Sequence, residues 1–239
     1  MTLQGRDMQR TYEAVLSNIE ADLRAGRLKR GDQLPGERIL AETYGISRAS
    51  VRDAIRILDA MGVVHTSAGS GPNSGAVVIS EPATGLSAAL RLHVAANSLP
   101  VADIVETRIL LETWAAGRQQ VSTPAAAAAA SEAAMVLAEM DSPDLDRGTF
   151  HVLDARFHVL LSALAGNAVI QAMMDSLSGA IRDYVTHATD TMPQWPTVLQ
   201  TLRSQHHAIF DAVISGRRDD AARLLREHIE WFYQQADRR

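Results

Sequence analysis

The chain has 239 residues and a formal net charge of −5, and its composition is 46% hydrophobic and 21% charged. These proportions are typical of a soluble globular protein and provide enough chain for one large domain or two ordinary ones. The absence of cysteine excludes disulfides, and the absence of any run of about eighteen apolar residues argues against a membrane span. Without an apolar secretory signal in the first residues, we expect a cytoplasmic protein.

The first eighty residues predict two helices, a tight turn and a third helix. Apolar residues recur at helical spacing over 8–26, and a stretch with glycine and proline separates them from a short helix at about 37–43. Gly45 interrupts that helix. Ser47 is suited to cap the next helix, because its hydroxyl can accept a hydrogen bond from a free N–H of the first turn.

A hairpin is predicted after the third helix. Two short β-branched runs, "VVHT" and "AVVIS", flank a loop rich in Gly, Ser, Pro and Asn. Helix, helix, tight turn, helix and hairpin follow one another in the order of a winged helix-turn-helix. We therefore predict such a domain over residues 8–80, followed by a linker at 81–86.

The rest of the chain shows only helical patterns. Apolar positions recur at three- and four-residue spacing between short breaks such as "NSLP", "DSPD" and "AGN". The alanine run at 125–130 is predicted to be helical, because alanine has the highest helix propensity. We predict an all-helical domain over 87–236. The expected fold class is mainly α, with an N-terminal winged helix-turn-helix followed by an all-α bundle of six or seven helices.

The predicted third helix has one apolar face and one basic face. Its two rows of side chains are Val51, Ala54, Ile55 and Leu58 on one side, and Arg48, Arg52 and Arg56 on the other. In one interpretation, this is a surface helix whose arginines pair with Asp53 and Asp59. In the other, it is a recognition helix. Residues 1–80 carry ten basic against nine acidic side chains and are not strongly basic overall, so the arginines matter only if they cluster on one face.

The N-terminal end of this helix favours binding to DNA. Ser47, Arg48 and Ser50 lie at the end that a recognition helix inserts into the major groove. The planar fork of an arginine matches guanine O6 and N7 or phosphate oxygens, and serine hydroxyls suit phosphate.

The segment "GDQLPGERILAETYGISRASVRDAIRILDAMGVV" resembles the DNA-binding domain of the GntR family of bacterial transcription regulators, and the resemblance covers about residues 10–80. It implies DNA contacts from five side chains: Arg38, Ser47, Arg48, Ser50 and Arg52. Ala49 stands where many relatives carry a hydroxyl residue. The loop of the hairpin has no Arg or Lys, so Gly69 or Gly71 would contribute only backbone contacts.

Three histidines and one aspartate of the helical part form a candidate metal site. Asp154 and His158 are four residues apart and share one helix face. His206 and His228 lie about three turns on either side of the break at Gly216, so two antiparallel helices would bring them to similar heights. Such a group suits a divalent ion. The alternative is a set of separate surface or core histidines. His151 is a lesser candidate ligand, and His207 must point elsewhere.

The stretches "ETRILLE", "DARFHVLLSALAGN" and "HHAIFDAVISGRRDDAARLLREH" are similar to the ligand-binding domain of the FadR subfamily of GntR regulators. The resemblance implies a divalent ion on Asp154, His158, His206 and His228. Zinc is the first choice of ion, with nickel or manganese as alternatives. It also implies that Arg108 grips a carboxylate of an effector, whereas spacing alone suggests an ion pair with Glu112. Arg182 is a second candidate for the effector.

The expected function is that of a transcription regulator, and no enzyme activity is expected. A homodimer would bind a double-stranded DNA operator, and a small carboxylic acid at the metal site would control its operator affinity, most commonly as a repressor. Two alternatives stay open: a metal-dependent hydrolase fused to a DNA-binding module, and a regulator that senses the metal alone. The ion can also be structural.

Overall fold

The computed structural model describes residues 3–67, 75–119, 123–190, 192 and 194–237. The chain divides into two compact units, Met1–Leu86 and Ser87–Arg239. Among the described residues, none of the helices combines the length and apolar character needed to cross a membrane.

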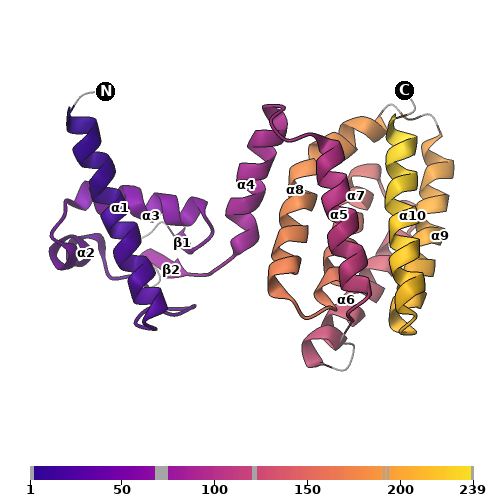
Figure 1. The fold of residues 1–239 in the computed structure, drawn as a ribbon, viewed down its shortest axis with the longest axis horizontal. Coiled ribbons are helices and arrows are strands. Elements are labelled where there is room, and N and C mark those ends of the chain that lie inside the picture. The colour runs from indigo at the N-terminus through magenta and orange to yellow at the C-terminus, as the bar shows by residue number, and fades with distance from the viewer. Residues whose placement is uncertain (1–2, 68–74, 120–122, 191, 193, 238–239) are drawn as a thin grey trace. The chain divides into compact units, whose positions relative to one another are not determined.

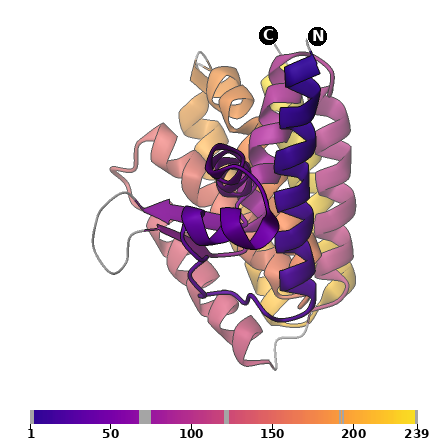
Figure 2. The same cartoon turned by 90° about the vertical axis from the view of Figure 1, so that its left-hand side faces the viewer.

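The first unit contains three helices and a two-stranded antiparallel sheet (Figure 1). The helices are α1 (Leu3–Arg24), α2 (Glu37–Tyr44) and α3 (Arg48–Ala60), and the strands are β1 (Val64–Ser67) and β2 (Gly75–Val78). This order confirms the winged helix-turn-helix expected from the sequence. Helix α1 packs against α3, as Figures 1 and 2 show.

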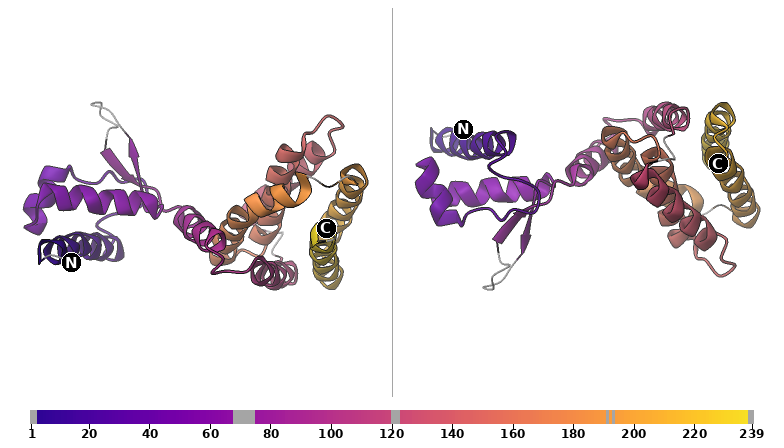
Figure 3. Two further views of the ribbon diagram at one scale, coloured as in Figure 1. Left: turned by 90° about the horizontal axis from the view of Figure 1, so that it is seen from above. Right: turned by 90° about the horizontal axis from the view of Figure 1, so that it is seen from below.

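A small apolar core joins these elements. It is formed by residues from all three helices and both strands, among them Val15, Ile19, Leu40, Val51, Ala54, Leu58, Val64 and Val78. The strands lie side by side (Figure 3), with Val64 opposite Val78 and Ser67 opposite Gly75. The loop between them, with Gly69 and Gly71, lies outside the described residues.

The following seven helices are those that the structure describes beyond residue 81. They are α4 (Pro82–Ala95), α5 (Val101–Ala116), α6 (Pro124–Met140), α7 (Arg147–Ala163), α8 (Ala168–Asp190), α9 (Trp195–Ile214) and α10 (Arg218–Asp237). The alanine run is helical within α6, as predicted. Helix α7 packs against α5, α6 and α8, while α10 lies beside α5 and α9 (Figure 1).

The segment 81–86, expected as an irregular linker, is helical from Pro82 onward. Proline is favoured in the first turn of a helix, where its missing N–H is not needed. Gly85 then lets this helix approach the preceding chain closely, since a Cβ at this position would lie 2.8 Å from the Cα of Met61. The glycine that suggested a loop in the sequence is therefore a packing residue of α4.

Candidate functional site

Helix α3 buries one face and presents its arginines on the other. Val51 and Ala54 are 0% exposed, while Arg48, Arg52 and Arg56 are all exposed. The helix begins as predicted, with the Ser47 hydroxyl accepting a hydrogen bond from the backbone N–H of Ser50 at 3.1 Å. The basic row is thus fixed on the surface by a capped and well-packed helix.

Ser50 departs from the expected role. Its side chain is buried, with 4% exposure, and its hydroxyl lies 2.9 Å from that of Ser47. The reason is helical spacing: Ser50 precedes the buried Ala54 by four residues, so both belong to the face that meets the core. This arrangement argues against a direct DNA contact from Ser50, whereas Ser47 is exposed.

The exposed arginines of this unit have only surface ion pairs. Arg52 Nε lies 3.4 Å from Glu37 Oε2, and Arg38 Nη1 lies 2.8 Å from Glu42 Oε1. Arg56 Nη1 is 3.7 Å from Asp53, and among the described residues Arg48 has no carboxylate within ion-pair distance. Exposed pairs contribute about 0–1 kcal/mol, so phosphate groups can replace these carboxylates at little cost.

Among the residues that the structure describes, Asp59 has no ion pair with an arginine, contrary to the surface-helix interpretation. Its carboxylate instead accepts a hydrogen bond from the Thr66 hydroxyl at 2.6 Å and one from the Thr66 N–H at 3.4 Å. Asp59 therefore connects the last turn of α3 to strand β1.

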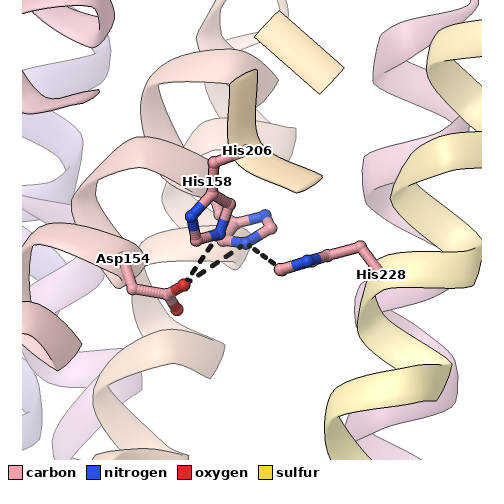
Figure 4. Close-up of side chains that lie close together, drawn as sticks. All are labelled: Asp154, His158, His206 and His228. Carbon is pink, nitrogen blue, oxygen red and sulfur yellow. Dashed lines mark hydrogen bonds and ion pairs between the residues drawn. The ribbon is translucent and has the colours of Figure 1, made fainter. Parts of the chain in front are cut away.

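The second unit brings Asp154, His158, His206 and His228 together (Figure 4). Asp154 and His158 come from α7, His206 from α9 and His228 from α10. One potential ligand atom from each residue lies within 4.8 Å of all the others. The three imidazoles are buried, and the Asp154 side chain keeps 24% exposure. One face of α7 and the hairpin of α9 and α10 thus supply the four groups.

The tight turn between α9 and α10 places His206 and His228 at matching positions along the two antiparallel helices. The α9 helix ends at Ile214, α10 begins at Arg218, and Gly216 adopts a φ of +69° between them. This left-handed conformation suits glycine and lets the chain reverse in a short turn. His206 and His228 consequently face each other, with ring centroids 4.6 Å apart.

The Nε2 atoms of the histidines converge. His158 Nε2 lies 3.2 Å from His228 Nε2, and Asp154 Oδ1 lies 3.0 Å from His206 Nε2 and 3.9 Å from His158 Nε2. Bonds of about 2.0–2.1 Å from nitrogen or oxygen to zinc place two ligands of a tetrahedral site about 3.3 Å apart. The observed distances bracket this value, so the donor set fits a divalent ion in both atom type and spacing.

The outer nitrogens of two of these rings are already engaged. His158 Nδ1 lies 2.5 Å from Glu112 Oε2, and His228 Nδ1 lies 2.9 Å from Gln205 Oε1. Both oxygens can only accept, so each Nδ1 carries the proton and donates it. In neutral imidazoles the two facing Nε2 atoms then both carry lone pairs. A proton or a metal cation must separate them.

Electrostatics keep the ligand atoms in the forms that bind metals. Burial lowers the pKa of His206 and His228, with the neighbouring imidazoles contributing to the shift of His228, so both rings are neutral at pH 7. Desolvation raises the pKa of Asp154, but the hydrogen bond with His206 and the electrostatic interactions with the neighbouring imidazoles outweigh it, and the net pKa is lowered. The site therefore offers the Asp154 carboxylate and the neutral imidazoles of His206 and His228, the forms that bind a divalent ion.

A small cavity adjoins the cluster and includes Arg108 in its wall. Its other lining residues include His151, Phe232 and Tyr233. Only about 20 Å³ is open to the centres of water molecules, roughly the space needed for one water. Arg108 is buried and pairs with Glu112, whose Oε1 lies 3.0 Å from both Nε and Nη2 of the guanidinium. The ion pair suggested by spacing is thus present at the edge of the cavity.

The remaining candidates have other partners, although His151 lines the same cavity as the ligands. His151 Nε2 lies 2.8 Å from the Thr189 hydroxyl, and His207 pairs with Asp141 on the surface. Arg182 is exposed and does not line the cavity, because its position on α8 directs it to solvent. Sequence reasoning did not assign Glu112 and Gln205 to the site. Glu112 had a signal, as a charged residue in an apolar helix, but Gln205 had none.

Comparisons with known proteins agree with this architecture. Residues 11–72 match the gntR family of bacterial regulatory proteins, and residues 103–230, more than half of the chain, match the FCD domain. The chain belongs to the GntR family. It is a GntR-family transcription regulator with an FCD effector-binding domain, and the matched families and relatives are regulators rather than enzymes.

Two curated relatives and one solved structure illustrate the match. LutR, an HTH-type transcriptional regulator of Bacillus subtilis (strain 168), is 28% identical over 87% of this regulator and 92% of LutR. An Escherichia coli (strain K12) protein named "Putative L-lactate dehydrogenase operon regulatory protein" is 24% identical, covering 94% and 86% of the two chains. The fold is similar to that of a Streptococcus agalactiae GntR, with a TM-score of 0.64 and 18% identity over 92% and 97%.

Proposed function

We propose that this GntR-family regulator is a cytoplasmic homodimer whose operator affinity is controlled by a small carboxylic acid bound at a divalent metal site, with zinc as the ion. The acid would enter the cavity beside Asp154, His158, His206 and His228 and release a repressor from its operator. The observation that carries this proposal is the convergence of Asp154 with three buried imidazoles, whose ligand atoms all lie within 4.8 Å of one another.

The residues of the site have separate roles in this proposal. Asp154 and the three histidines would hold the ion through one oxygen and three Nε2 atoms. A bound divalent ion supplies a coordination position for a carboxylate oxygen. Arg108 lines the same cavity, and the pairing with Glu112 engages only two of its five N–H groups. The remaining donors of this buried guanidinium suit the second oxygen of the acid.

The size of the cavity supports a link between ligand binding and conformation. Because the open space is about 20 Å³, an organic acid must displace side chains such as Phe232 or Tyr233 when it enters. Both belong to α10, which also carries His228. A ligand that binds only the displaced arrangement shifts the population toward it. We propose that this shift changes the separation of the two recognition helices in the dimer.

The DNA side of the proposal rests on α2 and α3. In a dimer, two copies of α3 would enter successive major grooves of a near-palindromic operator. Arg48 and Arg52 would contact base edges or phosphates, while Arg38 and the exposed Ser47 would contact the backbone. Their exposure and the weakness of their present ion pairs support these roles.

The relatives suggest which acid to test first. The name of the Escherichia coli relative refers to the operon of an L-lactate dehydrogenase. L-Lactate is a small carboxylic acid with a neighbouring hydroxyl, and such a pair of oxygens suits an ion with open coordination positions. We therefore propose small 2-hydroxy acids as the effector class of this regulator.

The experiment combines thermal unfolding with operator binding. Metal-free protein is loaded with zinc, nickel or manganese and then titrated with L-lactate, D-lactate, glycolate and the uncharged analogue lactamide. We expect an acid to raise the unfolding temperature only with metal present, and lactamide to have no effect. Asp154→Asn should remove the response, and Asp141→Asn, which changes an exposed carboxylate, should keep it.

Electrophoretic mobility shifts with promoter fragments from the organism's own genome then test whether metal and acid change the operator affinity. Release of the DNA by metal plus acid supports the proposal. Release or capture by zinc alone, unchanged by any acid, would instead identify a metal sensor. Equal operator affinity in all conditions would contradict both.

A further inference from the structure

We propose that Glu112 is a positioning residue for the metal ligand His158, and that Arg108 holds Glu112 in place; this inference rests on the proposed metal site. Both residues lie on α5, a helix that contributes no ligand to the cluster. The proposal gives the buried ion pair of α5 a role in metal affinity, independent of any organic acid.

The three side chains form a continuous buried chain of polar contacts. Glu112 Oε2 lies 2.5 Å from His158 Nδ1, and Glu112 Oε1 lies 3.0 Å from Nε and Nη2 of Arg108. The side chains of Arg108, Glu112 and His158 are 8%, 1% and 0% exposed. Each carboxylate oxygen therefore has its own partner, and no water is needed to satisfy either one.

This geometry fixes both the proton and the orientation of the His158 ring. A carboxylate can only accept, so Nδ1 must donate and Nε2 must present its lone pair to the cluster. Rotating the ring would break the 2.5 Å contact and leave a buried carboxylate oxygen unpaired, which is costly. A histidine ligand whose outer N–H is held by a carboxylate is also a more basic ligand.

The three histidine ligands differ in the hydrogen-bond partner of their Nδ1 atom. His228 Nδ1 meets the neutral amide oxygen of Gln205, and His206 Nδ1 has no hydrogen-bond partner among the described residues. Only His158 is held by a charged group that is itself held by a second charge. Loss of Glu112 should therefore affect metal binding more than a change at any other outer partner.

Arg108 would influence metal affinity indirectly, by holding Glu112 in place. Desolvation lowers the pKa of Arg108, but the nearby Glu112 carboxylate outweighs it and raises the net pKa, so the guanidinium stays charged. It can hold the carboxylate in one position because Nε donates a hydrogen bond to Oε1 and the charged Nη2 lies 3.0 Å from the same oxygen. Metal affinity should then depend on Arg108 even when no acid is present.

The test measures zinc affinity of the metal-free full chain by competition with a chromogenic chelator, without any organic acid. Glu112→Gln keeps an acceptor oxygen but loses the charge, and we expect roughly tenfold weaker zinc binding. The double variant Arg108→Met and Glu112→Leu removes the acceptor and leaves no unpaired buried charge, so it should fold. We expect roughly hundredfold weaker binding from it.

The matched control is Glu132→Gln, which removes an exposed carboxylate that pairs with Arg156 on the surface. Its zinc affinity should stay within about twofold of wild type, as expected for an exposed pair. A second readout follows the His158 ring in ¹H–¹⁵N spectra of the zinc form. The Nδ1–H signal should be far downfield in wild type and shift or vanish in the double variant, a change that a purely structural role would not produce.

The outcomes separate the inference from the proposed function. If wild type binds zinc and Asp154→Asn loses it, while both Glu112 variants retain wild-type affinity, the positioning role is overturned and the metal site stands. If wild type binds neither zinc, nickel nor manganese, the proposed function itself fails. Graded loss from wild type to Glu112→Gln to the double variant supports the inference.

Discussion

His158 on α7 and His228 on α10 face each other through Nε2 atoms 3.2 Å apart, although 70 residues separate them in the chain. Their outer nitrogens donate to Glu112 and Gln205, so the inner ones present lone pairs to the same small space. A cation bound at this point would join two helices that are far apart in the sequence. Metal binding and stability of the second unit should therefore be coupled.

Zinc should stabilise the metal-free protein against urea. A ligand that binds only the folded state contributes about 2.7 kcal/mol when its free concentration is one hundred times its Kd. Buffered zinc titrations with urea unfolding measure this gain. Asp154→Asn should remove most of it and His207→Gln, an exposed neighbour of His206, should not. A zinc-independent urea midpoint in wild type would contradict a site on the folded chain.

The metal-free protein should lose stability as the pH falls below about 6.5. Burial lowers the pKa of His206 and His228 in the folded state from their usual 6.5. Below pH 6.5 the unfolded chain therefore binds more protons, and the free energy of unfolding falls by up to about 1.4 kcal/mol per pH unit for each histidine. Urea midpoints at pH 7.5 and 5.5 check this, and His206→Gln should flatten the dependence.

Arg48→Ala and Arg52→Ala should each weaken operator binding by about 1–3 kcal/mol if the side chain contacts a base. Loss of a phosphate contact would instead reduce the slope of log affinity against log salt concentration by about one unit. Fluorescence anisotropy with labelled operator at several salt concentrations distinguishes the two. Arg226→Ala, an exposed arginine of α10 paired with Glu230, is the control. Wild-type affinity in both α3 variants would remove this helix from the interface.

Ser47→Ala should destabilise the first unit by about 1 kcal/mol, because the N-cap acceptor of α3 is lost. The buried Ser50 hydroxyl loses its partner at the same time. Ser204→Ala, an exposed serine within α9, should change the free energy of unfolding much less. Thermal unfolding of both variants measures the difference. Equal values would show that this cap contributes nothing to α3.

Arg108→Ala should destabilise the second unit by about 3–5 kcal/mol, since it leaves Glu112 buried beside one remaining partner. The double variant Arg108→Met and Glu112→Leu should recover most of this loss, because no buried charge is then uncompensated. Urea unfolding of the metal-free forms gives both values. A double variant less stable than Arg108→Ala would show that the ion pair itself stabilises the fold.

Much of this architecture could be predicted from spacing. The winged helix-turn-helix followed from apolar periodicity, turn residues and the N-cap at Ser47. Spacing placed Asp154 and His158 on one face and His206 and His228 at similar distances from the Gly216 turn, while the resemblance to FadR-type regulators implied that the two pairs form one site. Both arguments use one-dimensional periods that helices convert directly into shared faces or heights.

Other features depend on tertiary packing and could not be predicted from the sequence. Ser50 belongs to the buried face by its spacing from Ala54, but its hydroxyl and its place at the helix start suggested DNA instead. Glu112 and Gln205 become partners of His158 and His228 through the packing of α5 and α9. The residue spacing within a single helix gives no information about such packing. The helix that begins at Pro82 packs closely against Met61 at Gly85. Composition alone suggested a linker for this segment.

The bond between Asp59 and Thr66 has a consequence for the way the first unit meets a duplex. It ties the last turn of α3 to β1, so the helix and the adjoining strand arrive at the groove already oriented toward one another. Little conformational entropy is then lost in aligning them at the moment of contact. We therefore expect the Thr66 hydroxyl to favour the complex with DNA through preorganisation.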